Sequence, residues 1–183
     1  MRGINAQGKA SYQSMIVVAP DSPIKNLQQL KGKHFAFGSA DSTQGHLIPR
    51  IVLHEAGIEL EDFVSYDYTG SHSACANAVA SAKFDACGMQ DTMAQSMETS
   101  GLLRIIHRSR EYPSSGIAVH KNVPPEVITK VRQALLEFDP LLRHESGLYH
   151  WERTEMPGGF VAAADTDYAE LTEWLVKLEL LSN

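Results

Sequence analysis

The chain has 183 residues, of which 43% are hydrophobic, and a formal net charge of −6. A chain of this size can bury a core as one domain, or as one large lobe with a smaller appendage. The charges are spread without a basic cluster, which argues against a nucleic-acid partner. No run approaches the roughly 18 apolar residues that span a bilayer. The first residues, MRGINAQGKA, lack the apolar core of a secretory signal, so we expect a soluble chain.

The two cysteines and eight histidines form no recognisable metal or disulfide pattern. Cys75 and Cys87 are too few to define a disulfide framework, and their spacing fits no zinc motif. We expect both to be buried thiols, because free cysteine packs as a small hydrophobic residue. The histidines lack an H-x-x-x-H pair on a helix face, so we expect no metal and no cofactor.

Strands and helices are expected to alternate through the first part of the chain. Ser22 can cap a short helix that begins at Pro23. Pro49 should kink the next helix, because its nitrogen cannot donate to the carbonyl of Gly45. Glycines at 57 and 101 can end helices. Strands are predicted at 12–19, 34–39, 63–70, 84–90 and 102–109, and the main helices at 43–56, 71–83 and 92–101.

The character of the sequence changes near residues 111–115. We expect a strand at 114–123, a helix with proline in its first turn at 124–138, and an amphipathic helix at 167–181. No strand alternation is expected after Val119. The earlier alternation indicates βαβ units around a mainly parallel sheet, so the predicted fold class is α/β, with the closing helices packed away from that sheet.

Three polar sets follow the ends of predicted strands. They are SADSTQ after FAFG, TGSH after VSYDY, and MQD after FDACG. Open α/β sheets bind ligands where loops leave the carboxyl ends of strands. The first two sets also lie at helix N-termini, where free backbone N–H groups favour an anion. With the hydroxyls of Ser42 and Thr43 added, these donors could surround a tetrahedral oxyanion.

Helix capping is an alternative explanation for the same residues. Asp41 with Gln44 forms an acceptable capping box, and Ser71 could cap the helix after YTG. A lone histidine such as His72 is more often a structural donor than a ligand contact. Asp91 is more informative, because an acid that faces an anion pocket repels its ligand unless that ligand carries a proton or an amine. The residues alone leave capping and anion binding both open.

Motifs of catalysis are weak in this chain. It has no G-x-S-x-G elbow, no Walker lysine motif and no G-x-G-x-x-G. Ser42, His72 and Asp91 could be drawn as a triad on three adjacent loops, but nothing orders them as nucleophile, base and orienter. We therefore expect binding without catalysis.

Three stretches carry a resemblance to a known family. They read SMIVVAPDSPIKNLQQLKGKHFAFGSADSTQGHLIPR, YTGSHSACANAVASAKFDA and GGFVAAADTDYAEL. These stretches resemble the phosphate, phosphite and phosphonate-binding proteins of ABC transporters, typified by the phosphonate-binding periplasmic protein. The similarity runs from about Ser11 to Leu175. It implies a type 2 periplasmic binding fold of two lobes that closes on its ligand, an ABC permease as partner, and a periplasmic location.

The resemblance also assigns roles to individual residues. It implies that Ser42 and Thr43 bind phosphonyl oxygens, and that His72 matches the histidine at the next helix start. Asp91 matches an acid that can meet a ligand's amine or protonated oxygen. Gln44 departs from the family, which commonly has a small hydroxyl residue there. The candidate ligand-binding set is Ser42, Thr43, Gln44, Ser71, His72 and Asp91.

The resemblance further implies that the first lobe is incomplete, because family members carry a longer segment before YQSMIVV. Residues 1–20 would then be a crossover strand and a remnant of lobe one. Residues 21–112 would form lobe two, and residues 113–183 the return crossover strand and closing helices.

The missing part of lobe one has consequences for association. We expect the strands at 12–19 and 116–121 to pair with each other. Apolar faces without partners favour a homodimer or a domain-swapped oligomer. The residues whose apolar faces are expected to have lost much of their partner surface are Val127, Val131, Leu135, Trp174, Leu175 and Leu178.

The predicted function is the substrate-binding component of an ABC transporter that recognises phosphonate, phosphite or phosphate. The alternative is a sensory or interaction module of the same fold, coupled to a signalling protein. A third hypothesis, an enzyme of related fold such as those making thiamine-pyrimidine precursors, has no supporting cysteine or histidine motif.

Overall fold

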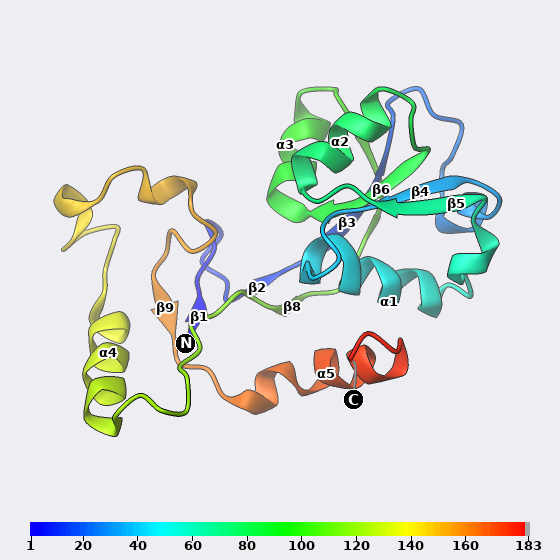
Figure 1. Cartoon of the computed structure of the whole chain (residues 1–183). Helices are drawn as coiled ribbons and strands as arrows, with labels where there is room; N and C mark the ends of the chain where they lie inside the picture. The colour runs from blue at the N-terminus through cyan, green and yellow to red at the C-terminus, as the bar shows by residue number, and fades with distance from the viewer. Residues whose placement is uncertain (182–183) are drawn as a thin grey trace. The chain divides into compact units, whose positions relative to one another are not determined.

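The computed structural model describes residues 1–181, which divide into two compact units (Figure 1). One unit holds Gln13–Arg110 and the chain from Trp174, and the other holds Met1–Tyr12 and Glu111–Glu173. Across residues 1–181, no helix is long and apolar enough to cross a membrane. The strands are β1 (Arg2–Gly3), β2 (Ser11–Tyr12), β3 (Ser14–Val18), β4 (His34–Phe37), β5 (Ser65–Tyr68), β6 (Ala86–Gln90), β7 (Arg104–Arg108), β8 (Tyr112–Pro113) and β9 (Phe160–Val161). The α-helices are α1 (Ile48–Glu55), α2 (His72–Ala80), α3 (Asp91–Thr99), α4 (Pro125–Glu137) and α5 (Ala169–Lys177).

The unit that contains residues 13–110 is built on a five-stranded mixed sheet of order β5-β4-β6-β3-β7. β4 pairs in parallel with β5 and β6, whereas β3 runs antiparallel to β6 and β7. Helices α2 and α3 cover one face of this sheet and α1 covers the other (Figure 1). The predicted α/β class is confirmed.

Strand alternation divides the core of this unit into two layers. Met15 and Val17 of β3 belong to the apolar cluster that includes Cys75, Val79 and Ala94 of α2 and α3. Because successive side chains of a strand point to opposite faces, the intervening residues of β3 point toward the α1 face. Each large side chain that is fully buried contributes about 1.5–3 kcal/mol to stability. The largest such side chains include Phe35, Phe37, Ile16, Ile48, Ile51 and Leu53.

The two cysteines form a disulfide, so the expectation of two free thiols was wrong. Cys75 of α2 and Cys87 of β6 are fully buried, and their Cα atoms lie 6.0 Å apart. That separation is ordinary for a bridged pair. The disulfide covalently joins α2 to the strand beneath it.

The predicted pairing of 12–19 with 116–121 was also wrong. β3 lies inside the sheet between β6 and β7, and the ladder between the two crossover segments is limited to β2 and β8. Residues 115–117 instead pair with the first residues of the chain, through a bridge between Gly116 and Arg2 and backbone hydrogen bonds to Met1 and Gly3. The late strand β9, which the sequence did not predict, pairs with β1. The β-branched pattern at 117–119 did not reveal that Ile117 hydrogen-bonds to the backbone of Met1 and not to residues 12–19.

The helix expected from Pro23 under a Ser22 cap is a short 3₁₀ helix at Leu27–Leu30 instead. Its cap is Asn26, whose side chain accepts a hydrogen bond from the backbone of Gln29. The predicted stops at Gly57 and Gly101 are confirmed, since both glycines adopt positive φ just after a helix ends.

The end of α5 belongs to the unit with the five-stranded sheet. The Trp174 ring packs edge-on against His54 with centroids 5.6 Å apart, and Leu178 is buried. Trp174 and Leu178 thus pack within this unit, contrary to the expectation that they had lost much of their partner surface. Val127 and Val131 are exposed on α4, in agreement with that expectation, and Leu135 of the same helix is half-buried.

The other unit, of residues 1–12 and 111–173, has a small core. Phe138, Trp151 and Phe160 form an aromatic cluster, with ring centroids 5.1 Å apart between Phe138 and Trp151. Glu111 binds both Lys9 and the hydroxyl of Ser11, which holds β2 beside β8. None of the residues of α4 is buried.

We expect the Cys75→Ala/Cys87→Ala variant to be less stable than the parent chain. Closing a loop of 12 residues restricts the unfolded chain by an amount worth about 3 kcal/mol. The measurement is the free energy of unfolding in urea, with and without a reducing agent. Reductant should destabilise the parent and leave the variant unchanged; equal stability of all samples would contradict the disulfide.

Candidate functional site

The polar sets predicted from the sequence lie at one edge of the five-stranded sheet. β4, β5 and β6 run parallel, so their carboxyl ends lie at the same edge. Ser42, Thr43 and Gln44 follow β4, Ser71 and His72 follow β5, and Asp91 directly follows β6. The fold therefore gathers all six candidate residues at this edge.

The loop after β4 is folded by a close approach of two glycines. The Gly38 N–H donates to the Gly45 carbonyl at 2.8 Å. A Cβ added at Gly38 would lie 3.2 Å from the Gly45 Cα, and one added at Gly45 would lie 2.9 Å from Cε1 of His72. A side chain at Gly45 would collide with the His72 ring and one at Gly38 would crowd Gly45, so the two glycines allow this close packing.

Pro49 determines how the helix after this loop begins. Its missing N–H leaves the Gly45 carbonyl available for Gly38. The chain makes a π-helical turn at Thr43–Leu47 and only then the regular helix α1. The predicted kink at Pro49 is thus realised as a change of helix type, with the proline in the first turn of α1.

Ser42, not Asp41, caps this helix, so the predicted capping box of Asp41 and Gln44 was wrong. The Ser42 hydroxyl oxygen accepts a hydrogen bond from the Gly45 N–H at 2.9 Å. Asp41 instead accepts a hydrogen bond from the Ser39 hydroxyl at 2.6 Å, which lowers the pKa of the Asp41 carboxyl. The cap uses an acceptor site of Ser42 and leaves its O–H able to donate.

The second polar set begins α2, where the predicted Ser71 cap is confirmed. The Ser71 hydroxyl oxygen accepts from the Ala74 N–H at 3.1 Å. At the next residue, Nδ1 of His72 accepts a 3.4 Å hydrogen bond from the Gln90 N–H. A neutral His72 ring then carries its proton on Nε2.

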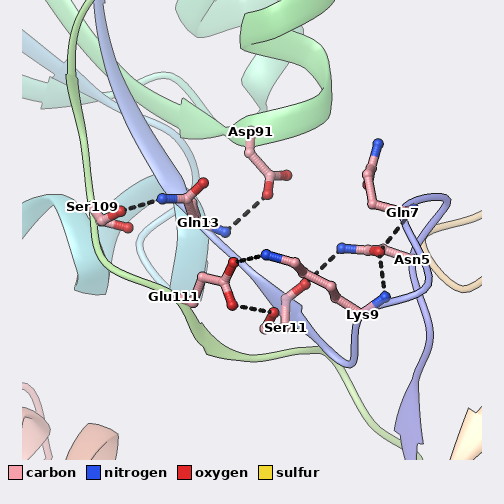
Figure 2. A network of polar contacts seen from close by, with 8 residues as sticks. All are labelled: Asn5, Gln7, Lys9, Ser11, Gln13, Asp91, Ser109 and Glu111. Atoms are coloured by element: carbon pink, nitrogen blue, oxygen red, sulfur yellow. Dashed lines mark hydrogen bonds and ion pairs between the residues drawn. The ribbon is translucent and has the colours of Figure 1, made fainter.

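Asp91 and Gln44 contact each other and the residue that precedes β3. The Gln13 N–H donates to Oδ2 of Asp91 at 2.9 Å (Figure 2). Nε2 of Gln44 donates to the Gln13 carbonyl at 2.8 Å and lies 3.4 Å from Oδ1 of Asp91. No pattern in the sequence pointed to Gln13, since its role depends on contacts with residues 31 and 78 positions away.

A cavity of about 440 Å³ lies beside the first polar set. Ser42 and Thr43 line it, whereas the other four candidates do not. Its remaining walls come from Ala40, Asp41, His46, Leu47, Leu175 and Leu180. Within residues 1–181, no group of three or more His, Cys, Asp or Glu side chains could hold a metal ion.

His46 is a buried residue of this region that the sequence analysis missed. Its Nδ1 lies 2.5 Å from the Ala40 carbonyl, and its Nε2 lies 3.0 Å from the Tyr68 hydroxyl. The carbonyl can only accept, so Nδ1 carries the proton and Nε2 accepts from Tyr68. Burial lowers the pKa of His46, with Arg50 adding to the effect against the bond to Ala40.

The fold and the site define a class of α/β proteins in which polar side chains gather where parallel strands end and helices begin, here with Ser42 and Thr43 lining a small cavity. The sequence model described as "ABC transporter, phosphonate, periplasmic substrate-binding protein" matches residues 1–168. The chain belongs to this family, whose type 2 periplasmic binding fold it shares.

Individual relatives agree with this assignment. The phosphonates-binding periplasmic protein of Escherichia coli K12 is 30% identical over 145 residues, 74% of this chain and 43% of that protein. The probable ABC transporter phosphite binding protein PhnD1 of Prochlorococcus marinus MIT 9301 is 43% identical over 67 residues, 36% of this chain and 23% of that protein. The chain thus spans less than half the length of these curated relatives.

The solved structure of PhnD1 from Prochlorococcus marinus in complex with methylphosphonate has the same fold. It superposes with a TM-score of 0.75 at 23% sequence identity, over 94% of this chain and 68% of that structure.

We expect acidification to destabilise the unit around His46. Because the pKa of His46 is lowered from 6.5 in the folded chain, the unfolded chain binds this proton first. Stability is therefore full above pH about 6.5 and falls as the pH drops toward the folded-state pKa.

The measurement is the free energy of unfolding at pH 7.5 and pH 5 for the parent and for His46→Gln. The variant should lose less stability on acidification, although it is less stable at pH 7.5. Burial also lowers the pKa of His107, so part of the dependence should persist in the variant. An unchanged pH dependence would show that His46 does not carry it.

Proposed function

We propose that the chain is the substrate-binding part of an ABC importer and binds a phosphate-like oxyanion: phosphonate, phosphite or phosphate. The observation that carries this proposal is the pair of hydroxyls of Ser42 and Thr43, which line the cavity at the start of the helix after β4. Membership of the phosphonate-binding family supports the same class of ligand.

The ligand chemistry follows from what these residues can donate. Backbone N–H groups at a helix start and the helix dipole stabilise a negative charge. Hydroxyl and imidazole N–H groups add donors, and hydrogen bonds to a charged oxygen are stronger than neutral ones. We propose Ser42, Thr43, Gln44, Ser71, His72 and Asp91 as the residues that form or support the oxyanion site.

We further propose that the chain performs no catalysis. Each member of the triad considered above is engaged with a backbone amide: Ser42 with Gly45, His72 with Gln90, and Asp91 with Gln13. These contacts support structural and binding roles over a proton relay. The proposed partner is an ABC permease and the proposed location is the periplasm, by membership of the family.

Isothermal titration with phosphate, phosphite, methylphosphonate and 2-aminoethylphosphonate tests the binding proposal. We expect heat with at least one of them and about tenfold weaker binding by Thr43→Val, because a hydrogen bond to a charged group is lost. Thr99→Val, which changes a threonine at the end of α3, should bind as the parent does. No heat with any oxyanion would refute binding by this chain.

The unpartnered surface of α4 supports the proposal that the chain self-associates. Val127 and Val131 are 42% and 49% exposed on this helix. Apolar patches of this kind favour burial against another protein surface. We propose a homodimer or a domain-swapped oligomer.

Light scattering should therefore give a mass above that of one chain. Val131→Glu should shift the population toward monomer, because a carboxylate would be buried in the contact. Gln133→Glu adds the same charge on α4 outside this apolar pair and should have little effect. A monodisperse parent monomer would argue against the proposal.

A further inference from the structure

Both carboxylate oxygens of Asp91 are occupied by donors of the protein itself. Oδ2 accepts from the Gln13 N–H at 2.9 Å. Oδ1 accepts from the Thr92 N–H at 2.8 Å and lies 3.4 Å from Nε2 of Gln44. Its donors therefore come from three segments: the residue before β3, the loop after β4, and the first turn of α3.

Gln44 is hydrogen-bonded through both its side chain and its backbone to residues at the start of β3. Its side-chain amide donates to the Gln13 carbonyl at 2.8 Å, and its backbone carbonyl accepts from the Ser14 hydroxyl at 2.6 Å. Gln44 is only 8% exposed and does not line the cavity. Its contacts fix the backbone directly after Thr43, which does line the cavity.

Gln13 and Ser14 are also hydrogen-bonded to Ser109, which directly follows the neighbouring strand β7. The Gln13 side-chain amide donates to the Ser109 carbonyl (Figure 2), and the Ser14 N–H donates to the Ser109 hydroxyl at 2.9 Å. Gln13 is the first residue of its unit, and Ser109 is the residue before Arg110, where the chain leaves that unit. Asp91 thus accepts a hydrogen bond from Gln13, and Ser109 restrains the position of Gln13 and Ser14.

We propose that Asp91 is a positioning residue: it holds Gln13 and Gln44, and through them Thr43, and it does not contact the bound oxyanion. This inference rests on the proposed oxyanion site. It differs from the role that family resemblance implies, in which the acid meets an amine or a protonated oxygen of the ligand. Asp91 is absent from the lining of the cavity that Ser42 and Thr43 form, in agreement with the positioning role.

The two roles predict opposite results for removal of the negative charge. If Asp91 faced the ligand, Asp91→Asn would relieve repulsion and tighten binding of anions without an amine, while weakening 2-aminoethylphosphonate. If Asp91 positions Gln13 and Gln44, asparagine replaces one acceptor oxygen by an NH₂ group that faces N–H donors of the protein and cannot accept from them. All oxyanions should then bind more weakly by a common factor, whatever their substituent.

The experiment titrates the 183-residue chain and its variants with methylphosphonate, phosphate and 2-aminoethylphosphonate. We expect Asp91→Asn to weaken all three by a similar factor of roughly tenfold, the worth of a charged hydrogen bond. Gln44→Leu should have a similar effect. The double variant should be weakened by less than the product of the two single effects, because the two residues act through one set of contacts.

Hydrogen exchange at the Gln13 amide is measured in the same variants without ligand. Asp91→Asn should speed this exchange, because the acceptor of that N–H is altered. Asp85→Asn is the matched control, since Asp85 also accepts a backbone N–H, that of His34, at the amino end of β4. It should leave oxyanion affinity and Gln13 exchange unchanged.

Tighter binding of phosphate and methylphosphonate by Asp91→Asn would overturn the proposal, as would unchanged exchange at Gln13 or additive effects of the two variants. If the parent binds none of the three oxyanions, the proposed function fails. Faster hydrogen exchange at the Gln13 amide in Asp91→Asn would then still support the contact by which Asp91 positions Gln13, and unchanged exchange would refute it.

Discussion

The contact between Gly38 and Gly45 is the constraint on which the site depends. It requires a carbonyl freed by Pro49, two residues without side chains, and room for the proline ring on the neighbouring strand. Gly88 of β6 provides that room, since a Cβ there would lie 2.5 Å from Cγ of Pro49. One proline and three glycines thus place the start of the helix against the ends of β4 and β6, where Ser42 and Thr43 face a cavity.

The sequence revealed local structure well, because local structure depends on nearby residues. The runs that became β3, β4, β6 and β7 are apolar or β-branched, and glycines at 57 and 101 ended helices as their conformational freedom predicts. Since the parallel strands were identified, their carboxyl ends could be expected to meet at one edge. That expectation places the six candidate residues at the same edge of the sheet, where the strand order puts them.

Contacts between distant residues could not be predicted in the same way. A spacing of 12 residues between Cys75 and Cys87 does not say that a helix and a strand will place them in contact. The partner of β3 depends on which strand edges are available, and the strand-like stretch at 117–119 meets the backbone of Met1 and not that of β3. The choice between Asp41 and Ser42 as cap was a shift of one residue, within the usual uncertainty of helix boundaries.

Capping and anion binding, which the sequence left as alternatives, are compatible for a hydroxyl group. Ser42 caps with its oxygen and keeps a proton to donate, whereas a carboxylate only accepts. This difference separates the serine from the acids at the same edge. The acid that lines the cavity is Asp41, and the pKa of its carboxyl is lowered by Ser39. Its negative charge would repel a fully ionised ligand, so under the proposed function we expect a ligand that retains a proton or carries an amine.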